Sequence, residues 1–308
     1  MARRKRGLPV HGWVIVDKPS GISSAQAVAT VRRVYDAAKA GHAGTLDPLA
    51  TGVLPVALGE ATKTVPYVMD ATKDYDFTIQ WGEARSTDDR EGAVTATSDV
   101  RPDPEAIRQA TQLFVGEIEQ VPPIYSAVKV DGERAYKLAR SGEEVDLDSR
   151  RIEILAFDLE EVIDSDRARF RVSSGKGAYM RALARDLALG LGTVGHIVAL
   201  RRLRVGPFAQ EAAISLDSLA ELMHNPAASE HLRPVATALD GIPALALSGP
   251  EAKTLRNGQG VPVFRAMDRE RFGHLREGDV VYALEGETPV AIARIESGAI
   301  RPVRVLNL

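Results

Sequence analysis

Hydrophobic and polar side chains alternate along residues 74–81, DYDFTIQW, and this period of two predicts a strand with one apolar face. Its apolar positions are Tyr75, Phe77, Ile79 and Trp81. Residues 167–174, RARFRVSS, are predicted to form another strand. Three further strands are predicted near the end of the chain, at residues 279–284, 289–296 and 301–308.

Three other segments have features typical of amphipathic helices. Ser23 and Ser24 are suited to cap a helix whose apolar positions are Val28, Val31, Val34 and Tyr35. Asp103-Pro104 places proline at the favoured first position of a helix that continues towards Phe114. The turn at 175–177 leads into a third helix, which is predicted to bury Met180, Leu183, Ala184 and Leu187. Arg181 and Arg185, four residues apart, share another face of it.

Strands and helices mixed in this way predict an α/β protein with more than one domain, which 308 residues can hold. We place a basic tail at residues 1–10, a large domain at 11–238 and a small β-rich domain at 239–308. The composition, with 44% hydrophobic and 26% charged residues, is that of an ordinary globular protein. The chain has no cysteine, no secretory leader pattern and no apolar run of about 18 residues, so we expect a cytoplasmic protein without disulfides.

The net charge of −3 argues against a uniformly basic nucleic-acid binder, but the charges are unevenly distributed. Residues 143–166 contain ten acids and two bases, whereas residues 171–210 contain seven bases and one acid. Four more bases crowd residues 3–6. A basic face on an otherwise neutral protein can bind a polyanion, although charge runs are usually solvated surface.

Familiar cofactor and metal motifs fail on their context. Residues 190–195 match GxGxxG, but a helix precedes them where a dinucleotide site needs a strand, and Gly190 is better explained as a helix cap. Residues 126–129 match SxxK without the companion motifs of that enzyme class. The six histidines lack metal-ligand spacing, and no phosphate-binding loop is present. The sequence predicts neither cofactor nor metal.

The stretch GHAGTLDPLATG, residues 41–52, surrounds Asp47 with small and turn-forming residues. Taken alone, an aspartate before proline is most simply a turn or helix-cap residue. The longer stretch GHAGTLDPLATGVLPVALGEATK, however, closely resembles the signature of the TruB family of tRNA pseudouridine synthases. Four more segments resemble motifs of this family in the same order: GWVIVDKPSGISS (12–24), KDYDFTIQWG (73–82), VPPIYSAVKVDGERAYKLAR (121–140) and SSGKGAYMRALARDLALGLG (173–192).

The resemblance implies a pseudouridine synthase fold, with a mixed and largely antiparallel sheet flanked by helices. The last 70 or so residues resemble the small PUA-type RNA-binding domain of many family members. The implied reaction isomerises uridine 55 of the tRNA T-loop by base flipping, glycosidic bond cleavage and rejoining through carbon. It implies tRNA as partner, with no membrane, guide RNA or obligate protein partner, and a monomer that needs no cofactor.

The resemblance also implies roles for individual residues. Asp47 is the catalytic aspartate, acting on the sugar as nucleophile or as base, and Arg181 pairs with it. Tyr75 packs on the base, His42 fills the space that the base leaves, and Tyr179 and Leu200 line the pocket. Four cations are candidate phosphate contacts: Lys18, Lys63, Arg201 and Arg202.

Each of these residues also has a plain structural interpretation. Arg181 could be a surface cation, Tyr75 the first inward residue of a strand, and Lys18 a support of its Lys-Pro turn. His42 could be a loop residue, and Tyr179 and Leu200 could be core. The chain departs from the family at Arg85, where threonine is frequent, but keeps the aspartate at Asp89.

Two other functions remain as alternatives. One is a guide-dependent synthase of the related group that works with protein partners. The other is an RNA-binding factor that remodels tRNA without modifying it. Asp47, Tyr75 and Arg181 together favour catalysis, because binding alone requires no such acid.

Overall fold

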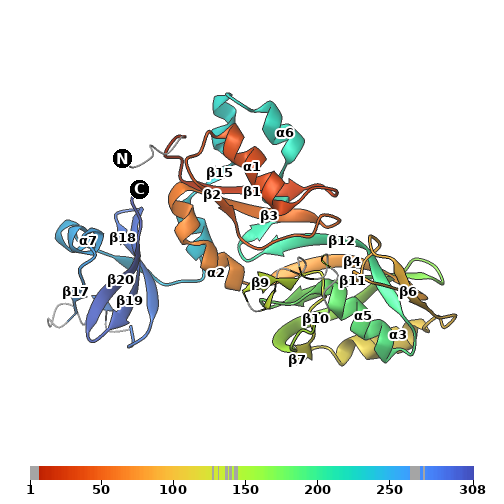
Figure 1. Cartoon of the computed structure of the whole chain (residues 1–308). Helices are drawn as coiled ribbons and strands as arrows, with labels where there is room; N and C mark the ends of the chain where they lie inside the picture. The colour runs from red at the N-terminus through yellow and green to blue at the C-terminus, as the bar shows by residue number, and fades with distance from the viewer. Residues whose placement is uncertain are drawn as a thin grey trace.

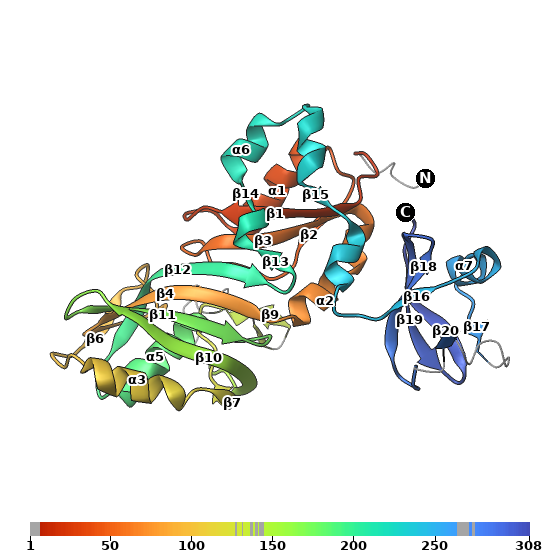
Figure 2. The same cartoon turned by 180° about the vertical axis from the view of Figure 1, so that it is seen from behind.

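The chain folds into two β-sheet domains joined by a short linker (Figures 1 and 2). The computed structural model describes residues 7–126, 128–130, 132–135, 138, 141, 145–263, 271, 272 and 275–308. None of the helices within these ranges is long and apolar enough to cross a membrane.

The larger sheet has eleven strands within the described residues, in the order β14-β1-β3-β12-β4-β11-β10-β7, with β2, β13 and β15 attached beside this path. In chain order they are β1 (Gly12–Lys18), β2 (Ala40–His42), β3 (Thr51–Leu58), β4 (Lys73–Trp81), β7 (Gly116–Gln120), β10 (Arg150–Val162), β11 (Arg167–Ser174), β12 (Gly195–Val205), β13 (Phe208–Ala209), β14 (Ile214–Ser215) and β15 (Leu232–Arg233). Two pairings, β1 with β14 and β12 with β3, are parallel, and the others are antiparallel. The sheet is therefore mixed and largely antiparallel, as expected.

Helices flank this sheet. The α-helices of the larger domain are α1 (Ser24–Val34), α2 (Val65–Asp70), α3 (Pro104–Gln112), α5 (Met180–Gly190) and α6 (Leu216–Glu221), and the 3₁₀-helices are η1 (Gly59–Lys63), η2 (Gln210–Ala212), η3 (Pro226–His231) and η4 (Val235–Leu239). In Figure 1, α1 and α6 lie at one end of the domain, and α3 and α5 lie at the other. Two short ribbons complete it, β5 (Glu83–Arg85) with β6 (Val94–Thr97) and β8 (Lys129–Val130) with β9 (Glu133–Arg134).

The predicted local elements are largely confirmed. Ser23 caps α1 in a capping box with Gln26, and the Asp103 side chain caps α3. One detail was wrong: Gly190 is the last helical residue of α5, and Gly192 takes the left-handed conformation, with φ of +71°. The turn that follows leads into β12, a long central strand that the pattern analysis did not predict.

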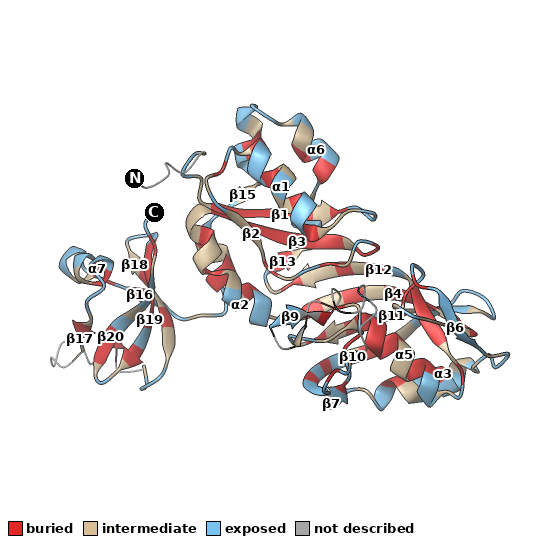
Figure 3. Cartoon of the chain, viewed as in Figure 1, coloured by how far each residue is buried: buried red, intermediate tan, exposed pale blue. Residues whose placement is uncertain are grey.

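Burial follows the sheet (Figure 3). The apolar face of β4 is buried, as its alternation predicts, and Phe77 stacks on Phe170 of β11 with ring centroids 5.6 Å apart. Phe157 of β10 packs against Phe170 at 5.5 Å. This aromatic cluster fixes the positions of β4 and β11, whose ends border the site described below.

The smaller domain has a five-stranded sheet in the order β16-β18-β19-β20-β17. Its elements are β16 (Ala244–Ala246), α7 (Gly249–Arg256), β17 (Val261–Pro262), β18 (Val280–Glu285), β19 (Thr288–Glu296) and β20 (Ala299–Val305). The three predicted late strands correspond to β18, β19 and β20.

The residues after β20 return to the larger domain. Leu306 is almost fully buried in a cluster that includes Trp13 and Ile15 of β1. Lys63 Nζ donates to the carbonyl of Val305 at 2.8 Å, and Asn307 N donates to Glu60 Oε2 at 2.8 Å. The last residues of the chain therefore attach the small domain to η1.

Candidate active site

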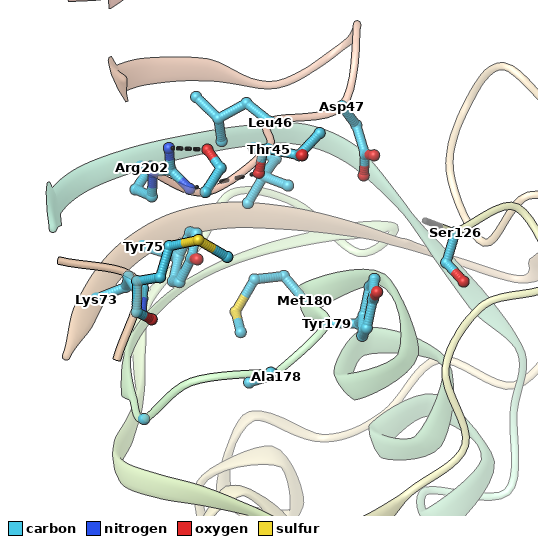
Figure 4. Close-up of a pocket in the computed structure, with 15 residues that line it drawn as sticks. Thr45, Leu46, Asp47, Lys73, Tyr75, Ser126, Ala178, Tyr179, Met180 and Arg202 are labelled. Atoms are coloured by element: carbon cyan, nitrogen blue, oxygen red, sulfur yellow. Dashed lines mark hydrogen bonds between the residues drawn. The ribbon is translucent and has the colours of Figure 1, made fainter. Parts of the chain in front are cut away.

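A cavity of about 310 Å³ opens between the loop that carries Asp47, the end of α2, β4 and the start of α5 (Figure 4). This volume lies at the lower end of the range of about 300–1,000 Å³ that is typical of small-molecule sites. Its lining includes Asp47, Tyr75, Tyr179, Leu200 and Arg202, which lie far apart in the sequence. Because Ser126 also lines the cavity, residues from four of the five family motifs quoted above meet there.

The Asp47 loop is held from one side by residues 18–24. Ser24 Oγ both donates to the carbonyl of Leu46, at 3.0 Å, and accepts from Leu46 N, at 2.8 Å. Lys18 Nζ donates to the carbonyls of Pro19, Ile22 and Pro48 at 2.8, 2.9 and 3.2 Å. The backbone on both sides of Asp47 is therefore fixed by groups from the motif at the beginning of the chain.

Arg202 holds the loop from the other side. Its guanidinium donates to the carbonyls of Val53 at 2.8 Å, Gly44 at 3.0 Å and Thr45 at 3.4 Å. Gly52 has φ of +99°, and a Cβ there would lie 2.2 Å from the Arg202 carbonyl oxygen. Position 52 therefore requires glycine, because the protein's own backbone approaches it too closely for a side chain. This contact was not predicted from the sequence.

Arg181 joins the loop to two other segments. Its Nε donates to Asp47 Oδ2 at 2.9 Å, while its two Nη atoms donate to the carbonyls of Thr87 at 2.7 Å and Tyr125 at 2.8 Å. The Arg181 side chain is 4% exposed, whereas that of Asp47 is 35% exposed. Arg181 is thus a buried cation beneath a carboxylate at the cavity rim, and the interpretation as a surface cation was wrong.

A second carboxylate lies beside Arg181. Asp89 is buried, its Oδ2 lies 3.7 Å from Arg181 Nε, and its Oδ1 accepts from Thr87 Oγ1 at 2.5 Å and Glu91 N at 3.0 Å. The Arg181 guanidinium is therefore held between two carboxylates, which restricts its orientation relative to Asp47. Asp89 matches the family pattern, but no role for it was predicted from the sequence.

The aromatic and apolar candidates lie where a base would be enclosed. Tyr75 and Leu200 line the cavity from β4 and β12, and Tyr179 lines it just before α5. Burial raises the pKa of the Tyr179 hydroxyl, which keeps it protonated and neutral. His42, at the end of β2, is not among the residues that line this cavity.

The four candidate phosphate contacts differ in their surroundings. Lys18 and Arg202 are buried and donate to backbone carbonyls, so their positions do not fit a phosphate contact. Both positions fit a structural role, which for Lys18 is the alternative given above. Arg201 is partly exposed and pairs with Asp17 through two contacts, of 3.0 and 2.9 Å. Lys63 pairs with Glu60 at 2.6 Å, beside the chain terminus.

The basic run at 171–210 is not a free cationic face. Six of its seven bases lie within 4 Å of a carboxylate oxygen, and the seventh is the buried Arg202. The six are Arg171, Lys176, Arg181, Arg185, Arg201 and Arg204. Charge counting along the sequence missed this because the partners, such as Asp74 and Asp17, come from other strands.

Two family models and several known proteins match this chain. The model described as TruB family pseudouridylate synthase, N-terminal domain, matches residues 32–180, and that of the tRNA pseudouridylate synthase B C-terminal domain matches residues 181–240. The chain is 57% identical over 308 residues to tRNA pseudouridine synthase B of Rhodospirillum rubrum, covering 100% of both chains. The chain belongs to the TruB family. The TruB protein of Caulobacter vibrioides is 49% identical over 309 residues, again covering 100% of both.

Solved structures agree on the fold. A structure described as an H/ACA RNP bound to a substrate RNA containing 2′-deoxyuridine has a TM-score of 0.74 at 23% identity, covering 100% of this TruB chain and 92% of that chain. An archaeal box H/ACA sRNP Nop10-Cbf5 complex gives 0.73 at 24% identity, covering 100% and 93%. At these identities the likeness concerns the fold, which is that of the pseudouridine synthases.

Proposed function

We propose that this chain is a tRNA pseudouridine synthase that isomerises uridine 55 of the T-loop to pseudouridine, with Asp47 as its catalytic carboxylate. The observation that carries this proposal is the pairing of Asp47 at the cavity rim with the buried Arg181. A binding protein would gain nothing from burying a cation to orient one partly exposed acid.

The rim position of Asp47 suits attack at the sugar. A uridine in a folded T-loop must flip out of its stack, and its ribose stays at the rim because it remains joined to the RNA backbone. The base then extends inward between Tyr75 and Tyr179. Asp47 meets the anomeric carbon, where it either adds to C1′ or removes the 2′ proton.

The reaction balances without any co-reactant. The N1–C1′ bond breaks and its electron pair leaves with the base. The base turns and C5 bonds to C1′; this step displaces the Asp47 carboxylate if it had added to C1′, or is accompanied by return of the proton to C2′ if Asp47 had removed it. The C5 proton then departs, and N1 takes up a proton. Arg181 holds the Asp47 carboxylate in one orientation through a charge-assisted hydrogen bond of 2.9 Å.

We further propose that the enzyme acts as a monomer on free tRNA, in the cytoplasm, without guide RNA or protein partner. The supporting observation is the contrast in identity: tRNA pseudouridine synthase B proteins match at 57% and 49%, whereas the proteins of the H/ACA complexes match at 23% and 24%. We also propose that the small domain is a PUA-like domain and that it contributes to RNA affinity.

The test is release of tritium from unmodified tRNA labelled at C5 of uridine, with the purified chain as the only macromolecule added. The matched control is the same tRNA with cytidine at position 55. We expect release of label from the first RNA and none above background from the second. Tight binding of tRNA without release would favour the folding factor, and release only after a guide RNA and partner proteins are added would favour the guide-dependent synthase.

A further inference from the structure

Buried charge around the cavity is strongly unbalanced. Within the described residues, four cations of this domain are buried, Lys18, Lys73, Arg181 and Arg202, but Asp89 is the one buried carboxylate. Of these four, Arg181 has a carboxylate oxygen within 4 Å, whereas Lys18, Lys73 and Arg202 instead donate to backbone carbonyls in the described part of the chain. Uncompensated buried cations are costly, so their position here calls for an explanation.

Two of the four cations stand at the end of the cavity away from Asp47. Figure 4 shows Lys73 and Arg202 on either side of Tyr75, across the cavity from Asp47. Tyr75 and Arg202 are paired residues of β4 and β12, and Lys73 is two residues before Tyr75 on the same strand. Lys73 is a buried residue, whereas the Asp47 side chain is 35% exposed at the cavity rim.

This arrangement matches the charge that develops during the proposed reaction. With the ribose at Asp47, the base points across the cavity toward Lys73 and Arg202. When the N1–C1′ bond breaks, its electron pair passes to N1 and is shared with the carbonyl oxygens of the ring, so the base becomes an anion. Fixed positive groups in a site that excludes water stabilise such charge efficiently.

We propose that Lys73, together with Arg202, stabilises the anionic base as it leaves C1′, and that Lys73 is thus a further functional residue of this enzyme. The inference rests on the proposed function, since another reaction would place no negative charge there. Lys73 is the more informative of the two residues to change, because Arg202 also holds the Asp47 loop.

Lys73 also has a structural contact that an experiment must separate from its charge. Its Nζ donates to the carbonyl of Met69 and, at 2.5 Å, to that of Ala71, at the end of α2. The carbonyl ends of helices attract cations, so capping alone would account for a lysine here. A variant that keeps the charge and one that removes it distinguish the two roles.

The groups around Lys73 give this charge a pH dependence. Burial, together with the nearby charges of Arg202 and Lys176, lowers the pKa of Lys73 to about 8, and the charge of Asp70 acts in the opposite direction. Lys73 therefore loses its charge as the pH rises through about 8, and kcat/KM, which reports ionisations of the free enzyme, should fall there. Arginine at this position stays charged at higher pH.

The experiment compares wild type, Lys73→Met, Lys73→Arg and Lys176→Met in single-turnover conversion of uridine at saturating enzyme, with tRNA affinity and melting temperature measured in parallel. Lys176 is the matched control: it is an exposed lysine that pairs with Asp70 at 3.0 Å, at the end of the same helix. We expect Lys73→Met to lower the rate at least tenfold with tRNA affinity nearly unchanged, since loss of one stabilising group can cost about 100-fold. Lys73→Arg should recover most of the rate, and Lys176→Met should match wild type.

Three outcomes would overturn the inference. One is a wild-type rate for Lys73→Met, another is an equal loss in both Lys73 variants, and the third is a loss confined to tRNA affinity. If Lys73→Met does not fold, the pH profiles decide: the alkaline fall in kcat/KM must move to higher pH in Lys73→Arg. If the alkaline fall in kcat/KM does not move, another group causes it, such as Lys18. Burial lowers the pKa of Lys18 to about 8 as well. If the wild-type enzyme converts no uridine, the proposed function itself is refuted. That result is distinct from the three outcomes that would overturn only the inference about Lys73.

Discussion

Arg181→Lys keeps a positive charge beneath Asp47 but removes the planar guanidinium that fixes the orientation of the Asp47 carboxylate. The arginine makes three charge-assisted contacts with three separate segments, namely with Asp47 at 2.9 Å and with the carbonyls of Thr87 at 2.7 Å and Tyr125 at 2.8 Å. Lysine has a single nitrogen and cannot reproduce this geometry. The substitution therefore tests whether orientation, beyond charge, makes Asp47 competent.

The expected magnitudes follow from the contacts that are lost. Two carbonyls lose their donor, and at about 1.5 kcal/mol for each hydrogen bond to a charged group the loss is about 3 kcal/mol. For a domain of this size, that lowers the melting temperature by about 6–12 °C. A carboxylate displaced by about 1 Å from its productive position costs about 100-fold in rate.

The assay is single-turnover formation of pseudouridine at saturating enzyme, well below the melting temperature of the variant. Arg185→Lys is the matched control, because Arg185 lies one turn along α5 and makes comparable contacts, with Asp88 at 3.0 Å and the Val121 carbonyl at 2.9 Å, none of them with Asp47. We expect both variants to lose stability and Arg181→Lys alone to lose rate. A wild-type rate in Arg181→Lys, or an equal rate loss in the control, would refute the reasoning.

Three other substitutions test the supports of the site. Gly52→Ala should destabilise the fold severely in thermal melts, because its Cβ would meet the Arg202 carbonyl, whereas Gly41→Ala, with nothing within 4 Å, should melt like wild type. Burial lowers the pKa of Lys18 from 10.5 to about 8, so the unfolded chain binds the extra proton between these pH values and Lys18 makes the free energy of unfolding rise with pH. Lys18→Met should flatten that rise in urea titrations, and an unchanged slope would contradict the assignment. Leu306→Ala should weaken docking of the chain end by about 2–5 kcal/mol, measured as faster hydrogen exchange in η1, and unchanged exchange would count against that anchor.

Local elements could be predicted from the sequence wherever one periodicity dominated. The strand around Tyr75 and the helix capped by Ser23 were correct because burial on one face and a capping side chain are both local signals. The strand β12 was missed because its run of arginines hides the apolar alternation. Arg201 and Arg204 are tolerated in a central strand because Asp17 of β1 and Asp74 of β4 pair with them, which no local pattern reveals.

The site could be predicted only through the family resemblance. Spacing alone made Asp47 a turn residue, and it gave no sign that Arg181 lies 2.9 Å away across 134 positions. Ser24 and Lys73 were missed because each looks like a local residue, a helix cap in one case and a strand end in the other. Their contacts with the Leu46 backbone and with the end of α2 arise only in the folded chain.

The central claim is that Asp47 performs the chemistry and contributes little to holding the RNA. The most direct measurement is tritium release from C5-labelled, unmodified tRNA by Asp47→Asn and wild type, with tRNA affinity measured on the same preparations. The account predicts that the variant binds tRNA like wild type and releases no label above background. Release at the wild-type rate by Asp47→Asn would contradict it.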